Sequence, residues 1–283
     1  MIKTIKNWIS YGLATVGGLL ICCYLYGTIL EPNWIEIVPI NLTIPHLSES
    51  FNNFKLVQIS DIHLSDYMPK ARLDKIARLV NQQQADAVVI TGDFITRKHK
   101  FVAENLIEFL NQINSSEVTL SVMGNHDRQH REEKKLEQAL IKSKVINLDN
   151  QIYVIHRDTE KLIFAGIDDP YVGQPDLTKV VEQLTDNSPV ILLVHQPDFV
   201  DISAKTGKFA LQLSGHSHGG QIKMPFLPPS FLPPGGQKYF AGLNQVDHTL
   251  VYTNRGLGMT AVPIRFNSRP EITVFTFKIA LSY

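Results

Sequence analysis

The sequence predicts an α/β fold in which two β-sheets pack face to face with helices on their outer faces. In the first half of the chain, short apolar runs rich in β-branched residues alternate with segments of helical periodicity. The second half is richer in strand-like runs. An uncharged, mostly apolar run over residues 7–30 adds one N-terminal transmembrane helix to the prediction.

Length and composition agree with a globular α/β protein. The chain has 283 residues, of which 44% are hydrophobic and 19% are charged. Its formal net charge is zero, so we expect no nucleic-acid partner. The only cysteines, Cys22 and Cys23, are adjacent and lie in the apolar run. This excludes a disulfide framework and leaves His, Asp, Glu and Asn as candidate metal ligands.

The apolar run is long enough to cross a bilayer as a helix, and aromatic residues lie towards its ends. Lys3 and Lys6 precede the run, and the next Lys or Arg is Lys55. The positive-inside rule therefore predicts a single-pass anchor in the cell membrane with the rest of the chain outside the cytoplasm. A cleaved signal peptide and a buried core helix are the alternatives. The length of the run and the lack of a small-x-small cleavage site favour the anchor.

Three prolines, Pro32, Pro39 and Pro45, punctuate the segment that follows. We predict a linker that leads into an edge strand over residues 34–44, since proline is tolerated at sheet edges. The predicted division of the chain is a membrane anchor at 1–31, a linker with an edge strand at 32–53, and a globular domain at 54–283.

Strands and helices alternate in the first part of the globular domain. This order predicts right-handed crossovers and a largely parallel sheet covered by helices. The predicted strands are 55–60, 87–91 and 118–123, and the predicted helices are 69–84, 101–113 and 131–144.

The second part is predicted to form another sheet, beginning with a hairpin of residues 152–155 and 162–167. Two sheets packed face to face would bury all of these runs. The remaining predicted strands are 190–194, 209–214, 249–253 and 272–277, and the predicted helices are 176–185 and 197–205.

A proline-rich segment at residues 224–236 stands apart from these patterns. Its prolines exclude a helix or a central strand. One interpretation is a loop over the core. The other is an exposed apolar flap that touches lipid or covers an acyl chain, because the segment contains Phe226, Leu227 and Phe231.

Five predicted strands end in residues of metal-ligand type. A single histidine is more often structural than a ligand, but five of the ten histidines follow predicted strands. The carboxyl ends of the strands are where open α/β sheets place their ligands, and Asp, His and Asn suit Mn²⁺, Fe or Zn²⁺. In order, the strand ends are Asp61-Ile62-His63, Gly92-Asp93, Gly124-Asn125-His126-Asp127, His195 and Gly215-His216-Ser217-His218.

Two metal ions held close together need a bridging carboxylate, and we assign Asp93 to that role. Asp93 follows the buried strand 87–91, and Gly92 removes the Cβ that would obstruct close backbone approach. A pair of cations clamps an in-line phosphoryl displacement and lowers the pKa of bound water towards about 7.

This ordered set resembles the calcineurin-like metallophosphoesterases over roughly residues 54–277. The resemblance implies a four-layer α/β/β/α sandwich and two divalent metal ions, with Mn²⁺ as first choice and Fe or Zn²⁺ as alternatives. It implies that His126 faces the scissile phosphate as general acid or charge stabiliser, with Asp127 orienting it. The implied ligands of one metal are Asp61, His63, Asp93 and His218, and those of the other are Asp93, Asn125, His195 and His216.

Departures from the family pattern indicate which branch of the family the chain resembles. Protein Ser/Thr phosphatases typically have Asp-Arg where Thr96-Arg97 stand here, and Glu where Asp127 stands, which counts against that branch. The anchor, Gly219-Gly220-Gln221 and residues 254–258 resemble the membrane-anchored bacterial branch. That branch includes relatives that hydrolyse the pyrophosphate of UDP-2,3-diacylglucosamine in lipid A biosynthesis. The resemblance therefore implies a phosphoester substrate, lipid-linked in part of the branch.

The leading hypothesis is a membrane-anchored binuclear-metal hydrolase of a phosphodiester or pyrophosphate bond. Arg255 and Arg265 are candidates for a bidentate phosphate contact, or else for surface salt bridges. One alternative is a phosphodiesterase that acts on soluble nucleotides. A second is a non-catalytic binding scaffold, in which we would expect some of the metal-ligand residues to be replaced. The predicted topology conflicts with a UDP-linked substrate, because such substrates are made in the cytoplasm. No pattern indicates an oligomeric state.

Overall fold

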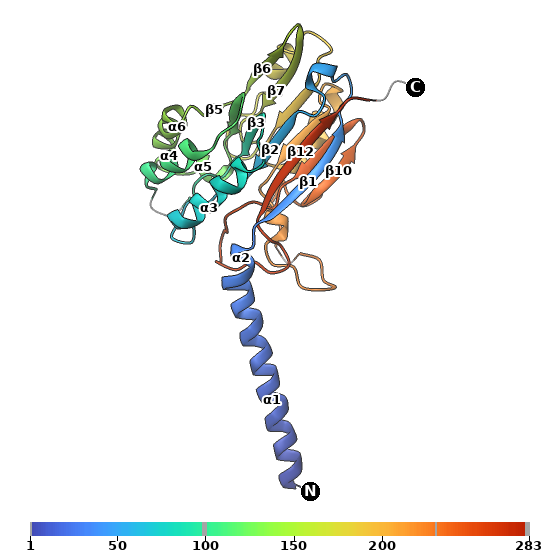
Figure 1. Ribbon diagram of the computed structural model, residues 1–283. Helices are drawn as coiled ribbons and strands as arrows, with labels where there is room; N and C mark the ends of the chain where they lie inside the picture. Colours follow the sequence, from blue (N-terminus) through green and yellow to red (C-terminus); the bar gives the residue numbers. More distant parts are fainter. Residues whose placement is uncertain (1, 98–100, 230, 281–283) are drawn as a thin grey trace.

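The computed structural model describes residues 2–97, 101–229 and 231–280. Over these residues the predicted fold class is confirmed, with two six-stranded sheets packed face to face and helices outside them (Figure 1). The first sheet has the spatial order β1 (Glu36–Thr43), β12 (Glu271–Lys278), β2 (Lys55–Ile59), β3 (Ala87–Thr91), β4 (Val118–Val122) and β5 (Ile146–Asn147). The second has the order β10 (Gly242–Val246), β11 (Thr249–Thr253), β9 (Leu211–Ser214), β8 (Val190–Leu193), β7 (Glu160–Gly166) and β6 (Gln151–Arg157).

The central strands of both sheets are parallel. β2, β3, β4 and β5 pair in parallel in the first sheet, and β7, β8, β9 and β11 do so in the second. Every residue of β3 is buried, as expected for a parallel strand with both faces covered. The edge strand predicted at 34–44 is observed as β1, which pairs with β12. Parallel pairing brings the carboxyl ends of β2, β3 and β4 to one edge, and those of β8 and β9 to one edge of the other sheet.

Three layers of apolar side chains hold the sandwich together. Between the sheets, the ring of Phe54 lies 6.0 Å from that of Phe277 and 6.5 Å from that of Phe164. Helices α3 (Lys70–Asn81), α4 (Ala103–Gln112) and α6 (Glu133–Lys142) bury their apolar faces on the outer side of the first sheet. The outer face of the second sheet is covered in part by α7 (Leu177–Glu182). Because both sheets are covered, their strand ends are held rigidly.

One long helix, α1 (Ile2–Leu25), projects from the body of the molecule (Figure 1). By length and composition it is apolar enough to cross a membrane, and its described side chains are almost all exposed. It continues into a π-helical segment, η1 (Tyr26–Leu30), and a final turn, α2 (Glu31–Asn33). These last turns dock on the globular body. Arg265 N–H donates to Gly27 O at 2.9 Å, and the buried Glu31 carboxylate accepts from Asn267 N–H at 2.7 Å.

The structure departs from the predicted elements in several places, among them the two-residue strand β5, which was not predicted. The helix expected at 197–205 is three short turns, η3 (Pro197–Phe199), α8 (Val200–Ser203) and η4 (Ala204–Thr206). Strand β10 was not predicted because its sequence is largely polar, and the turn α5 (Asn125–Arg128) is too short to show periodicity. The proline-rich segment forms neither helix nor strand over 224–229 and 231–236, and Ser230 lies outside the described residues.

Candidate metal centre

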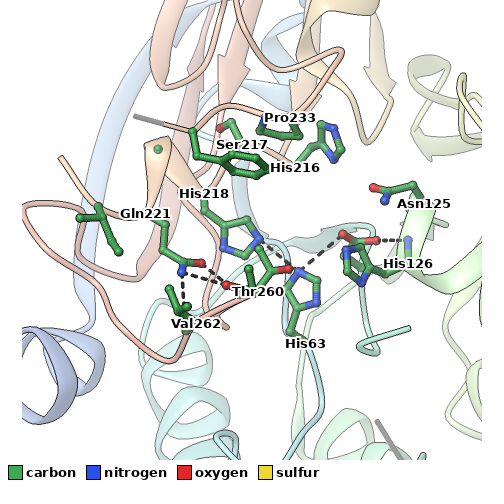
Figure 2. Close-up of a pocket in the computed structure, with 15 residues that line it drawn as sticks. His63, Asn125, His126, His216, Ser217, His218, Gln221, Pro233, Thr260 and Val262 are labelled. Carbon is green, nitrogen blue, oxygen red and sulfur yellow. Dashed lines mark hydrogen bonds and ion pairs between the residues drawn. The ribbon is translucent and has the colours of Figure 1, made fainter. Parts of the chain in front are cut away.

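The polar residues that follow the five strands lie together at the facing edges of the two sheets. Figure 2 shows the side chains of this region around a cavity of about 450 Å³. Six of the nine predicted site residues line this cavity, and Asp61, His195 and Asp127 lie behind its wall, fully buried. The lining residues from the predicted set are His63, Asp93, Asn125, His126, His216 and His218.

One group of ligand-type side chains consists of Asp61, His63 and His218. His218 Nε2 lies 3.1 Å from His63 Nε2 and 3.4 Å from Asp61 Oδ1. A cation with bonds of about 2 Å to nitrogen and oxygen sets its ligands about 3 Å apart, so these spacings fit one ion. Asp61 and His63 follow β2 of the first sheet, while His218 follows β9 of the second.

The other group consists of Asp93, His195 and His216. His195 Nε2 lies 3.2 Å from Asp93 Oδ2 and 3.2 Å from His216 Nδ1. The same oxygen, Asp93 Oδ2, also lies 3.5 Å from His63 Nε2 of the first group. The other oxygen, Oδ1, accepts the backbone N–H of His126 at 2.9 Å. Asp93 is therefore fixed with one oxygen turned towards both groups, as a bridging carboxylate requires.

Hydrogen bonds on the far side of the rings orient all four histidines of the two groups. His63 Nδ1 lies 3.3 Å from Thr96 Oγ1, and the Arg265 guanidinium donates to His218 Nδ1 at 3.4 Å. His195 Nδ1 lies 2.7 Å from the Thr91 carbonyl oxygen, which can only accept, so Nδ1 carries a proton and, in the neutral ring, Nε2 presents its lone pair. His216 Nε2 lies 3.0 Å from the Pro234 carbonyl oxygen, which leaves Nδ1 to face the group. This is the arrangement of metal-ligating histidines, in which the second nitrogen is held by the protein.

Asn125 provides an independent sign that a cation belongs here. Its side chain lines the cavity, and its buried Oδ1 has no hydrogen-bond partner among the described residues. Buried polar atoms nearly always have a hydrogen-bond partner, so a buried acceptor without one indicates that a ligand such as a cation binds there. An oxygen beside two Asp-His groups fits the ligand preference of a divalent cation, and the donor set as a whole fits two such ions.

The protonation states of the cluster also suit metal binding. Burial alone raises the pKa of Asp61 and of Asp93, but nearby histidines outweigh it and hold both below the ordinary value. Burial lowers the pKa of His63 well below its usual range, and burial with the neighbouring His195 lowers the pKa of His216 to about 4. Burial opposes protonation of His195, yet the charge of Asp93 raises its pKa to about 10. Near neutral pH the carboxylates are ionised and His63 and His216 are neutral, as ligands must be, whereas His195 is protonated beside Asp93 and would lose its Nε2 proton on binding a metal ion.

The backbone at the strand ends is strained. Five of the six residues of the two groups have positive φ, a conformation that non-glycine residues rarely adopt and that concentrates at functional sites. A Cβ on Gly92, which has φ +90°, would lie 2.6 Å from His195 Nδ1. The five φ values are Asp61 50°, His63 48°, Asp93 54°, His216 72° and His218 52°.

His126 faces the cavity beside the two groups. Its ring lies edge-on to that of His63, with 4.8 Å between centroids. Arg97 N–H donates to His126 Nδ1 at 3.2 Å, so in the neutral ring Nε2 carries the proton. Asp127 accepts from Ile95 N–H at 3.1 Å and from Gly124 N–H at 3.0 Å. Among the described residues these are the hydrogen-bond partners of the Asp127 carboxylate, and neither is the His126 ring.

Neither arginine singled out as a phosphate contact reaches the cavity lining. Arg255 forms ion pairs with Glu271 and, at 2.8 Å, with Glu36. Arg265 is fully buried and donates to main-chain oxygens, including that of Ser268 at 2.8 Å. The expectation of a phosphate contact is therefore not met, because both guanidinium groups are already engaged within the protein.

The wall of the cavity opposite the ligand groups is mostly apolar. Its apolar residues are Ile222, Phe231, Pro233, Ala261 and Val262. Phe231 and Pro233 belong to the proline-rich segment singled out from the sequence, whereas the other three were missed because a loop residue shows no periodicity and its place is set by contacts with distant segments. Figure 2 shows Pro233 and Val262 flanking the same space as His218.

Comparison with known proteins identifies the same family that the sequence motifs resemble. A model of the family described as calcineurin-like phosphoesterase matches residues 54–220, which include every predicted site residue. Over 286 residues the chain is 36% identical to YkuE of Bacillus subtilis (strain 168), an uncharacterized metallophosphoesterase, covering 98% of this chain and 96% of YkuE. It is 28% identical to the phosphodiesterase YaeI of Escherichia coli (strain K12), covering 86% and 88%. It is 31% identical to a Danio rerio transmembrane protein with metallophosphoesterase domain, covering 94% of this chain and 63% of that protein.

Proposed function

The chain belongs to the calcineurin-like phosphoesterase family, and from this premise we propose that it is a membrane-anchored binuclear-metal enzyme that hydrolyses a phosphodiester or pyrophosphate bond. The observation that carries the proposal is the placement of Asp93 Oδ2 between His63 Nε2 and His195 Nε2. One carboxylate oxygen thereby joins two groups of ligand-type side chains at the floor of a cavity.

Each group, completed by a shared or neighbouring residue, would hold one ion. Carboxylate and amide oxygens suit Mn²⁺ and imidazole nitrogens suit Fe or Zn²⁺, so the mixed donor set fits all three, of which we propose Mn²⁺ first. The proposed ligands are Asp61, His63, Asp93 and His218 for one ion, and Asp93, Asn125, His195 and His216 for the other.

Two bound cations would supply Lewis-acid polarisation of the phosphoryl group and a more acidic water. The protein positions the reaction around them. Asp93 fixes the spacing of the two sites, and Asn125 completes the donor set on the cavity side. His126 presents Nε2–H to the cavity, where it would donate to the leaving oxygen or stabilise charge on the phosphoryl group.

We propose that the substrate is lipid-linked, with UDP-2,3-diacylglucosamine as one candidate. The apolar wall made by Ile222, Phe231 and Val262 supports an apolar group close to the reacting phosphorus. Helix α1 supports a location at the membrane, and the Danio rerio relative is named a transmembrane protein.

The proposed division is an anchor at 1–31, a linker and edge strand at 32–53, and a phosphoesterase domain at 54–283. Lys3 and Lys6 place the catalytic domain outside the cytoplasm under the positive-inside rule. A reporter fused to the C-terminus and active on one side of the membrane only would test this. A cytoplasmic domain would favour a UDP-linked substrate, and an extracytoplasmic one would favour a lipid phosphodiester exposed outside.

The change Asp93→Asn tests the proposed mechanism. Because it removes the charge of the bridging carboxylate, we expect turnover of bis(p-nitrophenyl) phosphate with added Mn²⁺ to fall by about 10²-fold or more. Asp158→Asn, in the exposed turn between β6 and β7, is the matched control and should retain full activity. Full activity of Asp93→Asn would remove Asp93 from the mechanism.

Two further measurements separate the alternatives. A binding scaffold would hold no metal and show no hydrolysis with any divalent ion. A phosphodiesterase for soluble nucleotides would turn over a cyclic nucleotide faster than a lipid phosphodiester in micelles, whereas our proposal expects the reverse.

A further inference from the structure

The proline-rich segment presents a cluster of apolar side chains to solvent. We define the apolar tip as Met224, Phe226, Leu227 and Phe231, all of which are exposed. Phe226 is fully exposed, and Phe231 is 73% exposed. Single exposed apolar residues are ordinary on protein surfaces, but a cluster of this kind marks an interaction surface.

The apolar tip lies at the end of the body from which the anchor helix departs. Lys223 N–H, immediately before the tip, donates to Phe266 O at 2.8 Å. The ring of Phe266 lies edge-on to that of Tyr26 in η1, with 5.7 Å between centroids. Figure 1 shows the segment as an orange loop at the same end of the domain as α2. Any membrane that α1 crosses therefore lies on the side to which the tip projects.

Contacts at both ends and in the middle hold the segment in place. Lys223 is fixed on Phe266, and the carbonyl oxygen of Pro234 accepts from His216 Nε2 at 3.0 Å. Pro229 packs closely on the backbone of Gly220. A Cβ added to Gly220 would lie 2.7 Å from the Cβ of Pro229. Prolines restrict the chain further. The exposed rings are therefore displayed by a loop that is held by contacts on both sides of them.

We infer that the apolar tip is a second membrane contact, which inserts into the lipid interface beside the anchor helix. This inference rests on the proposed insertion of α1. Aromatic and aliphatic side chains favour the interfacial region of a bilayer, and continuity with α1 favours lipid over a second copy of the chain. Phe231 belongs to the tip and also lines the cavity. The half-exposed Val262 lines the cavity as well but is not part of the tip. The cavity thus opens against the lipid surface, where a lipid-borne headgroup enters without leaving the bilayer.

Fluorescence quenching tests the contact. The full chain, with Cys22→Ala and Cys23→Ala, is reconstituted in vesicles of phosphatidylcholine and phosphatidylglycerol, and Phe226→Cys carries a nitrobenzoxadiazole label. Ile141→Cys is the matched control, because Ile141 is 74% exposed on α6, away from α1 in Figure 1. We expect a blue-shifted emission at 226 that doxyl-labelled phosphatidylcholine quenches about twofold or more, and no quenching at 141.

The outcomes separate this inference from the proposed function. If the chain floats with the vesicles but the label at 226 is not quenched, the anchor stands and the lipid contact is refuted. If the chain does not float, the anchor and the lipid contact both fail. A blue shift without quenching by lipid would mean that protein, such as a second copy, covers the tip, and would also overturn the inference.

Activity gives a second measure. In the full chain in vesicles, Phe226→Asp with Leu227→Asp should lower turnover of a vesicle-borne lipid phosphodiester about tenfold. Turnover of soluble bis(p-nitrophenyl) phosphate should not change, because neither side chain lines the cavity. Ile141→Asp should change neither rate. An equal loss on both substrates, or no loss on either, would contradict the inferred contact.

Discussion

At the scale of single residues, the two oxygens of Asp93 have different surroundings. Oδ1 is held by the backbone N–H of His126, while Oδ2 faces the two histidines at 3.2 and 3.5 Å. The hydrogen bond therefore ties the position of His126 to the carboxylate that would bridge the ions. His126 itself contributes its ring to the cavity and no atom to either ligand group.

Because His126 lines the cavity but belongs to neither ligand group, a role in catalysis without a role in metal binding can be tested. We expect His126→Ala to retain two equivalents of Mn²⁺, since the ligand groups are intact, and to lower kcat by about 10²–10⁴-fold, the usual contribution of a proton donor. Metal content by elemental analysis and turnover of an aryl phosphodiester would be measured together. His156→Ala, at an exposed position in β6, serves as control. Loss of metal in His126→Ala would show that the residue is needed to build the site instead.

At the scale of elements, the junction between the anchor helix and the globular body is part of the support of the metal centre. Glu31 in α2 is fully buried and accepts the backbone N–H groups of Asn267 and Ser268. Ser268 Oγ in turn donates to the carbonyl oxygen of His218 at 2.8 Å. A contiguous set of hydrogen bonds therefore runs from the end of the anchor to a candidate ligand.

Removal of the Glu31 carboxylate should loosen this support. Glu31→Ala leaves the N–H groups of Asn267 and Ser268 without this acceptor, at a cost of about 1–3 kcal/mol for the buried Ser268, so thermal stability should fall. We expect Mn²⁺ affinity to weaken first at the group that contains His218. Thermal unfolding and Mn²⁺ titration of the full chain would measure both effects.

Glu36→Ala is the control for this experiment, because Glu36 is part-exposed and its ion pair with Arg255 should contribute about 1 kcal/mol or less. A Glu31→Ala chain that matched the Glu36→Ala chain in stability and Mn²⁺ affinity would show that the anchor is only a tether.

At the scale of the whole molecule, each ligand group combines residues from both sheets and from both halves of the sequence. The sequence predicted this convergence because parallel strands carry their carboxyl ends to one edge, so the order of Asp61, Asp93 and His195 was informative without coordinates. The support of the site was not predictable in this way. Glu31 and Asn267 are 236 positions apart, and no local pattern marks their contact. Arg265 was a candidate for a phosphate contact or a surface salt bridge, and its full burial could not be read from the sequence.

Because each proposed ion has ligands from both sheets, bound metal should clamp the sandwich as well as serve catalysis. Asp61 and His63 extend from the first sheet and His218 from the second, while Asp93 faces His195 across the same gap. Free metal at a hundred times Kd stabilises the folded state by about 2.7 kcal/mol for each site. For a body of this size, loss of both ions should lower Tm by about 10–20 °C on addition of a chelator, with recovery when Mn²⁺ is added back.

Scanning calorimetry of the full chain in detergent, with metal content measured alongside, would check this shift. Asp93→Asn should show a much smaller response to the chelator, because it lacks the shared carboxylate, while His156→Ala should respond like the unaltered chain. If Tm stayed the same after the metal had been shown to leave, the ions would not join the two sheets. The ligand assignment across the gap would then be wrong, even if hydrolysis still required metal.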